Sequence, residues 1–255
     1  MDFDEVACLP LDVGKFEFNR NLFDNMLEHD TLLQTGDARS SYVWKRKEVV
    51  LHAFGTTADD FFNVTTTTNS WYDRYEMKDF NGYNINPVFD NELKHEIQNM
   101  LDFILENIPI WPAHLTLVRS TGDVPMHCDC PQEQVHNFYN KGLEPSNVKI
   151  LLNVEDYDDT LFFQKYATKF EKAETQIKYL EKEKHIPNDT NVMGWSENFH
   201  GHGAIFNDDK TFRMLVNVFG PLDKEKYKEL RDRSWDKYKD YAIKFEMDTN
   251  DSYTW

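Results

Sequence analysis

Between residues 113 and 220 the chain consists of short apolar segments separated by turn residues. These segments are rich in β-branched and aromatic residues, a composition typical of strands. Many short strands with turns between them favour an antiparallel sandwich or barrel. The predicted strands are residues 114–119, 148–154, 161–163, 193–195, 203–206 and 212–219.

Helical patterns flank this β-rich region. Residues 91–107 carry apolar side chains at the i, i+3, i+4 spacing of one helix face, and Pro109 ends the pattern. Residues 19–28 and 224–245 are predicted to form two further helices, and residues 166–184 a charged, helix-prone insertion. The expected class is therefore α+β.

A single domain is the expected organisation, because no linker rich in Gly, Ser or Pro divides the 255 residues. Residues 1–112 are expected to form a helical and mixed support region, and residues 113–220 the β-rich core. An insertion is expected at 164–190, and residues 221–255 are expected to supply a C-terminal helix.

The composition limits the classes of partner. The formal net charge is −17, which argues against broad binding to the phosphate backbone of a nucleic acid. No apolar run approaches the roughly 18 residues of a membrane span, and the acidic N-terminus lacks the pattern of a secretion signal, so we expect a cytoplasmic protein with no membrane partner. The three cysteines are an odd number, which argues against a disulfide framework.

A candidate metal site is carried by three residues. His127 and Asp129 stand two residues apart, and on a strand residues at this spacing point to the same face. His202 adds a second imidazole later in the chain. Two histidines and one carboxylate form the facial triad that binds Fe(II) in non-haem oxygenases and leaves open coordination positions.

Two questions remain, which are which of two histidines is the second metal ligand and which residue binds a cosubstrate. His200 also lies two residues from His202 and could face the same way. We choose His202, because its spacing to Arg213 suits two neighbouring strands of one barrel. Arginine is permanently charged and can bind a carboxylate with two hydrogen bonds, which suits the far carboxylate of a keto-acid cosubstrate. The alternative for Arg213 is a salt bridge at a strand end.

The order His127-X-Asp129, His202, Arg213 resembles that of the Fe(II)/2-oxoglutarate-dependent dioxygenase superfamily. The resemblance spans roughly residues 113–220, where the strand pattern looks like that family's double-stranded β-helix, or jelly roll. It implies this core with flanking N-terminal and C-terminal helices.

Two shorter segments resemble a subgroup of this superfamily. Residues 118–129 are similar to the His-X-Asp segment of aspartyl/asparaginyl β-hydroxylases and free-proline hydroxylases, and residues 198–207 resemble their distal histidine segment. One departure is Leu215, which stands where many members have Ser or Thr two residues after the cosubstrate arginine. Lys149 and Asn153 could face the pocket and contact the cosubstrate instead, or belong to an exposed strand face.

The resemblance implies an Fe(II)- and 2-oxoglutarate-dependent oxygenase that uses O₂ and releases succinate and CO₂. Hydroxylation of an amino acid, a peptide or protein side chain, or a small metabolite is the expected reaction. The implied metal ligands are His127, Asp129 and His202, and the implied cosubstrate contacts are Arg213, Lys149 and Asn153.

Three alternatives stay open. The chain could be a non-catalytic metal-containing β-barrel that only binds, or a cupin-like metalloenzyme that uses no 2-oxoglutarate and has no need of Arg213. Cys128 and Cys130 beside His127 also suggest zinc. A structural zinc site normally needs four ligands, and the sequence has no second pair of cysteines, so iron is preferred.

Overall fold

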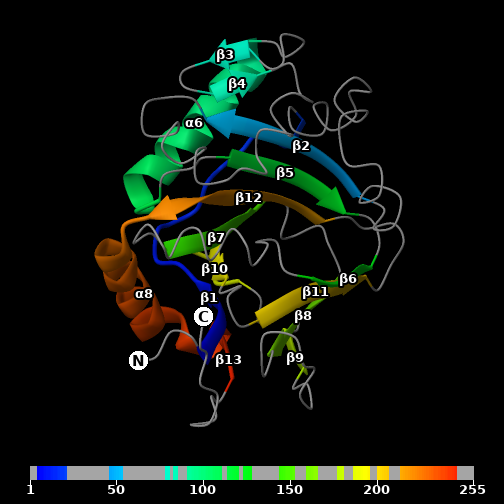
Figure 1. The fold of residues 1–255 in the computed structure, drawn as a ribbon, viewed down its shortest axis with the longest axis vertical. Helices are drawn as coiled ribbons and strands as arrows, with labels where there is room; N and C mark the ends of the chain where they lie inside the picture. Colours follow the sequence, from blue (N-terminus) through cyan, green and yellow to red (C-terminus); the bar gives the residue numbers. More distant parts are fainter. Residues whose placement is uncertain are drawn as a thin grey trace.

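Two antiparallel sheets organise the part of the chain that the computed structural model describes (Figure 1). The described residues are 5–21, 46–53, 78–80, 83–85, 91–110, 114–120, 123–127, 144–152, 159–165, 177–180, 186–195, 200–206 and 213–245. The strands are β1 (Val6–Pro10), β2 (Arg46–Ala53), β3 (Lys78–Phe80), β4 (Tyr83–Ile85), β5 (His114–Ser120), β6 (Val124–His127), β7 (Glu144–Leu151), β8 (Asp159–Lys165), β9 (Ile177–Leu180), β10 (Val192–Trp195), β11 (His200–Phe206), β12 (Arg213–Leu222) and β13 (Ile243–Lys244). The helices are α6 (Asn91–Asn107), α8 (Lys224–Tyr238) and the 3₁₀-helix η3 (Lys239–Tyr241). The architecture is mixed, with antiparallel sheets and helices, as the sequence predicts.

The chain passes repeatedly from one sheet to the other between β5 and β12. The larger sheet has the order β13-β1-β10-β7-β12-β5-β2-β4-β3, and the smaller has the order β6-β11-β8-β9. Figure 1 shows β6, β11 and β8 grouped below β12 and β5. Strands β11 and β12 follow each other in the sequence but belong to different sheets, so residues from both can face the space between the sheets.

A hydrophobic core fills much of that space. Leu215 on β12 is paired with Val118 on β5 and with Leu151 on β7, which places three buried apolar side chains at one level of the larger sheet. Full burial of each such side chain contributes roughly 1.5–3 kcal/mol. The smaller sheet supplies four buried side chains to the same cluster, which are Val124, Leu161, Phe163 and Ala204.

The central strands of the larger sheet are buried on both faces. Side chains alternate along a strand, and the residues that point away from the smaller sheet are as buried as those that point toward it. This double burial explains why β7 and β12 read as nearly continuous apolar segments. The residues on the outer face are Val148, Ile150, Val216 and Val218.

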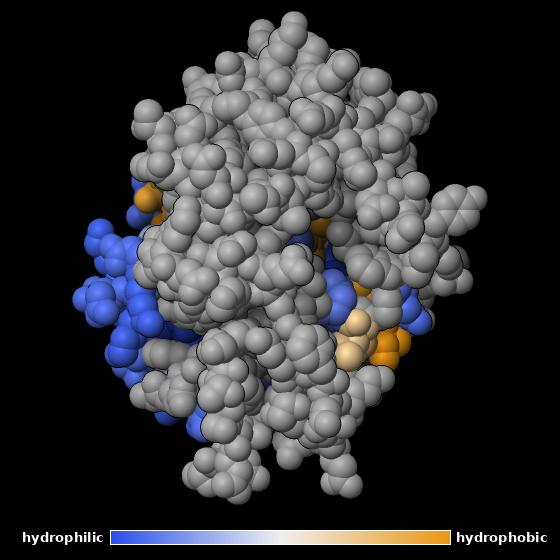
Figure 2. Space-filling model, in the orientation of Figure 1, coloured by the Kyte–Doolittle hydropathy of each residue, from blue (hydrophilic) through white to orange (hydrophobic). Residues whose placement is uncertain are grey.

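Helix α8 covers an outer part of the larger sheet beside β1. Tyr238 packs with Val6 and Leu9 of that strand, and Asp223 caps the start of the helix by accepting a 3.1 Å hydrogen bond from the backbone N–H of Lys226. The opposite side of α8 is exposed, and Figure 2 shows hydrophilic residues gathered where Figure 1 places this helix.

The predicted helix at residues 91–107 is confirmed at both ends. The predicted helix at residues 224–245 is correct at its start but ends at Tyr238. The residues that follow pair with β1 as strand β13, and Phe245 is completely buried in the core between the sheets. Strand pairing and burial of this aromatic ring therefore stabilise an extended segment over a longer helix.

The predicted helix-prone insertion differs from the structure at residues 177–180, which form β9 and pair with β8. Ile177 and Tyr179 favour strands, and the ring of Tyr179 lies 6.2 Å from that of Phe162 across the pair. The side chains of Ile177 and Tyr179 are largely exposed, as expected for an edge strand. Cross-strand contacts thus override the charged composition that suggested a helix.

Two further expectations concern helices. The predicted helix at residues 19–28 lies outside the described residues beyond residue 21. No helix in the described ranges combines the length and the apolar character that crossing a membrane requires.

Gly203 allows a close approach of three strands in the smaller sheet. A Cβ atom at this position would lie 2.5 Å from the backbone oxygen of Val124 on β6, and closer still to the ring of Phe162 on β8. A ring can turn aside, but a backbone carbonyl in a paired strand cannot. Gly203 is the neighbour of His202, so this close approach of strands occurs beside the imidazole.

We predict that Gly203→Ala lowers the free energy of unfolding by about 1–3 kcal/mol, the usual cost of overpacking a core. Urea unfolding followed by circular dichroism measures this. Phe162→Ala is the control background, because it removes the ring that a new methyl group at residue 203 would meet. Gly203→Ala introduced into this background should still clash with the carbonyl of Val124. An unchanged urea midpoint in both backgrounds would contradict the prediction.

Candidate functional site

A pair of histidines meets across two neighbouring strands of the smaller sheet. His127 ends β6, and its register partner on the antiparallel strand β11 is His202. The two ring centroids are 4.4 Å apart with an interplanar angle of 56°. His202 is buried, whereas His127 is half-buried. Two imidazoles this close, one of them reachable from solvent, can serve as ligands of a single borderline transition metal.

His200 occupies a different environment from His202. Its register partner is Lys165 on β8, and its ring stacks on Phe245 with centroids 5.2 Å apart and an interplanar angle of 25°. The ring is buried in contact with the C-terminal segment. The structure therefore brings His202, and not His200, to His127.

Trp195, the last residue of β10, holds the other side of His202. Its ring meets the imidazole edge-on, with centroids 4.4 Å apart and an interplanar angle of 74°. Phe163 packs edge-on against the same indole at 5.2 Å. These ring contacts limit the rotation of His202, since the imidazole lies between His127 and the indole.

Arg213 begins β12 and is buried, with 5% of its surface exposed. Its guanidinium carbon lies 5.7 Å from the ring centroid of Phe206, which ends β11. Phe206 and His202 are an even number of residues apart on β11, so both point to the same face of that strand. The structure therefore places a buried permanent cation toward one end of the face that carries His202.

Lys149 is a second buried cation in the same region. It lies on β7 next to the larger sheet's core residues, with 2% of its surface exposed. Its Nζ donates a 2.7 Å hydrogen bond to Oδ1 of Asn217 and lies 4.5 Å from the ring centroid of Trp195. Lys149 therefore faces the space between the sheets, as one of the two readings of the sequence predicts, and not solvent.

The position two residues after Arg213 supplies no hydroxyl group. Leu215 is buried in the core between the sheets. The next residue on that face of β12 is Asn217, which is the partner of Lys149. Polar groups on the inner face of β12 therefore stand on both sides of one apolar residue.

Two predicted site residues, Asp129 and Asn153, lie outside the described residues. Cys128 and Cys130 of the zinc alternative lie outside them too. In the part of the chain that the structure describes, no group of three or more His, Cys, Asp and Glu side chains gathers as metal ligands would. The histidine pair accounts for two donors of the predicted triad, and Asp129 follows His127 by two residues.

Cys8 is a free thiol near this region. It is the register partner of Trp195 and is completely buried. Burial raises the pKa of the Cys8 thiol well above its ordinary value, and the nearby charge of Lys149 opposes this shift only in part. Cys8 is therefore a protonated core residue. Metal binding requires the thiolate, so Cys8 is not a candidate ligand.

Trp195 and Asn217 are site residues that sequence reasoning missed. The signal was present in the alternation of side chains. Trp195 follows Met193 at a spacing of two on a predicted strand, and Asn217 follows Leu215 in the same way. An isolated polar residue on the inner face of an apolar strand is the pattern that could have drawn attention to Asn217.

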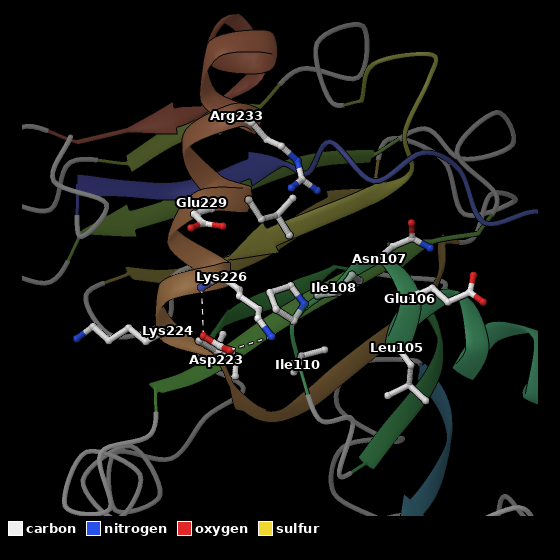
Figure 3. Close-up of a pocket in the computed structure, with 13 residues that line it drawn as sticks. Leu105, Glu106, Asn107, Ile108, Ile110, Asp223, Lys224, Lys226, Glu229 and Arg233 are labelled. Carbon is white, nitrogen blue, oxygen red and sulfur yellow. Dashed lines mark hydrogen bonds and ion pairs between the residues drawn. The ribbon is translucent and has the colours of Figure 1, made fainter.

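A separate hollow lies between the end of α6 and the start of α8 (Figure 3). Asp223 and Lys226 form an ion pair of 3.4 Å at its edge, and Glu229 and Arg233 extend along α8. The buried residues at its base are Ile108, Ile110, Leu222 and Leu230. Neither the histidine pair nor the two buried cations line it, so it is distinct from the candidate site.

Comparisons with known proteins do not define a family. No family model and no curated protein matches the sequence. Among solved structures, a nickel complex of the non-heme monooxygenase ThoJ is 13% identical with a TM-score of 0.34, covering 86% of this chain and 75% of that one. The Fe(II)/α-ketoglutarate-dependent dioxygenase TqaL is 12% identical with a TM-score of 0.34, covering 82% and 78%. A prolyl-4-hydroxylase from Pseudomonas putida is 10% identical with a TM-score of 0.31, covering 76% and 93%. At these values the likeness establishes neither the family nor the activity of this chain.

We predict that His202→Ala weakens metal binding far more than His200→Ala. Loss of a group that only orients a ligand typically costs about 10–100-fold in metal affinity, and His200→Ala should stay within or below that range. His202→Ala removes a donor and should exceed it. Anaerobic competition for Fe(II) against a coloured chelator gives both affinities, with circular dichroism as the check on folding. A larger loss in the His200 variant would reverse the assignment.

Proposed function

We propose that this chain is an Fe(II)- and 2-oxoglutarate-dependent oxygenase. Its reaction would consume O₂, release succinate and CO₂, and hydroxylate an amino acid, a peptide or protein side chain, or a small metabolite. The observation that carries the proposal is the register pair of His127 and His202, whose rings meet beside a space that also contains buried Arg213.

The path of the chain supports the corresponding fold. In a double-stranded β-helix, consecutive strands alternate between two facing antiparallel sheets. Strands β5 to β12 follow this path except that β9 follows β8 within the smaller sheet, and the order is β10-β7-β12-β5 in one sheet and β6-β11-β8-β9 in the other. We therefore propose this region as a jelly-roll core, with helices α6 and α8 flanking it on either side in the sequence.

The histidine pair, with Asp129 as the third ligand, would hold the iron. This donor set fits Fe(II), since it combines borderline imidazoles with a hard carboxylate. When bound, the iron would activate O₂ with electrons from 2-oxoglutarate and so supply the oxidant for hydroxylation. The chain's own contribution is to orient a ligand: the edge of Trp195 fixes the ring of His202, and burial keeps water from competing for it.

Arg213 would bind the far carboxylate of 2-oxoglutarate. A buried guanidinium interacts strongly with a carboxylate, because the low local dielectric strengthens a charge-assisted pair. Leu215 offers no hydroxyl group to assist it, so Arg213 carries this contact without the Ser or Thr found in many members of the superfamily. Lys149 and Asn153 remain proposed further contacts to the cosubstrate.

The deciding experiment is an anaerobic titration of the protein with Fe(II) and 2-oxoglutarate. Chelation of iron by the keto acid should produce a visible charge-transfer band, and admission of O₂ should then yield succinate. Asp129→Ala should lose both, while circular dichroism stays unchanged. A band without succinate across a broad substrate screen would favour the non-catalytic binding module, and absence of the band in the iron-loaded protein would favour the cupin-like alternative.

We predict that Arg213→Ala weakens 2-oxoglutarate binding by about 10-fold or more, because a hydrogen bond to a charged group is worth roughly 1.5–3 kcal/mol. Iron affinity should change little. The dependence of band intensity on 2-oxoglutarate concentration measures the effect. Arg213→Lys is the matched control, since it keeps the charge but not the two parallel hydrogen bonds. Its affinity for 2-oxoglutarate should lie between those of the wild type and of Arg213→Ala. Equal cosubstrate affinity in all three would place the far carboxylate elsewhere.

A further inference from the structure

A second pair of histidines occurs in the larger sheet. His52 of β2 and His114 of β5 are register partners on neighbouring antiparallel strands. Residues directly opposite each other in such strands belong to one face of the sheet, with Cβ atoms about 4.5–5.5 Å apart. His127 and His202 have the same relation on β6 and β11, where the ring centroids are 4.4 Å apart. The register of β2 and β5 therefore brings together two histidines that are far apart in the sequence.

Residues with oxygen donors extend this second histidine pair into a row across four strands. Asn84 of β4 stands opposite His52, and Asp79 of β3 stands opposite Asn84. Phe219 of β12 stands opposite His114 and ends the row on the other side. Asp79 adds a negative charge to the face to which both histidines belong, so this end of the larger sheet favours a cation over an anion.

The second histidine pair is separate from the candidate iron site. Trp195, which contacts His202, is joined to His114 in register through Asn147 and Phe219. These steps amount to three strand spacings of about 4.8 Å, or about 14 Å of sheet. Figure 1 likewise shows β3 and β4 on the opposite side of β12 from β6 and β11. A metal–imidazole bond is only about 2.0–2.1 Å long, so the second pair would serve a different ion.

The donors of the second pair favour a different metal from iron. Neutral imidazole suits zinc, copper and nickel, and Fe(II) stands near the weak end of the affinity order of divalent ions. Zn²⁺ is bound by imidazole nitrogen and accepts water in its remaining coordination positions. Because only neutral imidazole binds a metal, the affinity should fall as the pH drops below about 6.5.

We propose that His52 and His114 form a second metal site, which binds Zn²⁺ through the two imidazoles and water. The bound ion links β2 to β5 and so stabilises a pairing that closes a long loop of the chain. The inference goes beyond the proposed function and does not depend on it, because this site needs neither iron nor 2-oxoglutarate.

The test measures Zn²⁺ binding to the full, metal-free chain by equilibrium dialysis. His52→Gln and His114→Gln should each weaken binding at one site by more than about 100-fold, because loss of a direct ligand exceeds the roughly 10–100-fold cost of losing a group that only orients one. The double variant should lose no more than either single variant, since one substitution already destroys the pair. His95→Gln is the control, because it makes the same change at an exposed residue of α6, and it should keep the wild-type stoichiometry.

A second measurement needs no variant. Diethyl pyrocarbonate acylates neutral imidazoles, and Zn²⁺ should protect His52 and His114 together, at the same Zn²⁺ concentration, while His95 stays reactive. Mass spectrometry of peptides reads each histidine separately, so Zn²⁺ bound at His127 and His202 does not affect the result. Unaltered Zn²⁺ binding in either single variant, or failure of Zn²⁺ to protect both histidines of the second pair, would exclude the site. A protein that shows this site but no iron-dependent turnover would keep the site and lose the proposed function.

Discussion

The pairing of β6 with β11 is the interaction on which the candidate site depends. These strands lie in the smaller sheet, and a shift of one residue in their register would turn every second side chain to the opposite face. The observed register sets His127 opposite His202, and Gly203 allows the backbones to approach closely enough to hold it. Two residues distant in the sequence thereby become neighbours through backbone hydrogen bonds alone, before any ion is considered.

The inner face of the larger sheet also carries polar residues among its apolar side chains. On the inner face of the larger sheet, Lys149 of β7 and Arg213 and Asn217 of β12 stand among apolar core residues. Because both strands are central in their sheet, the buried side chains of Lys149 and Arg213 cannot reach solvent by a small movement. Their burial lowers the local dielectric and strengthens each polar contact, at some cost in stability. Such a compromise is common where proteins bind ligands.

Much of this arrangement could be predicted from the sequence, and the exceptions have identifiable causes. Helix 91–107 and most of the strands follow from periodicity, since local pattern and burial agree there. The extended segment at Phe245 and strand β9 were missed, because both are stabilised by contacts with residues far away in the sequence. The contact of Trp195 with Lys149 and His202 was missed for the same reason. Three different strands supply these residues, so no single segment of the sequence indicates the contact.

The pairing of β1 with β13 has a consequence for how the molecule is made. Val6 lies beside Lys244, and the ring of Phe245 completes the core between the sheets by stacking on His200. Contacts between residues so far apart in sequence form late, since the loop that they close is long. During synthesis, β1 emerges from the ribosome before either of its partners, β10 and then β13, has been made. Cys8 is buried in the folded protein and pairs with Trp195 of β10, so its reactivity toward a thiol reagent would report how far assembly of these strands has progressed.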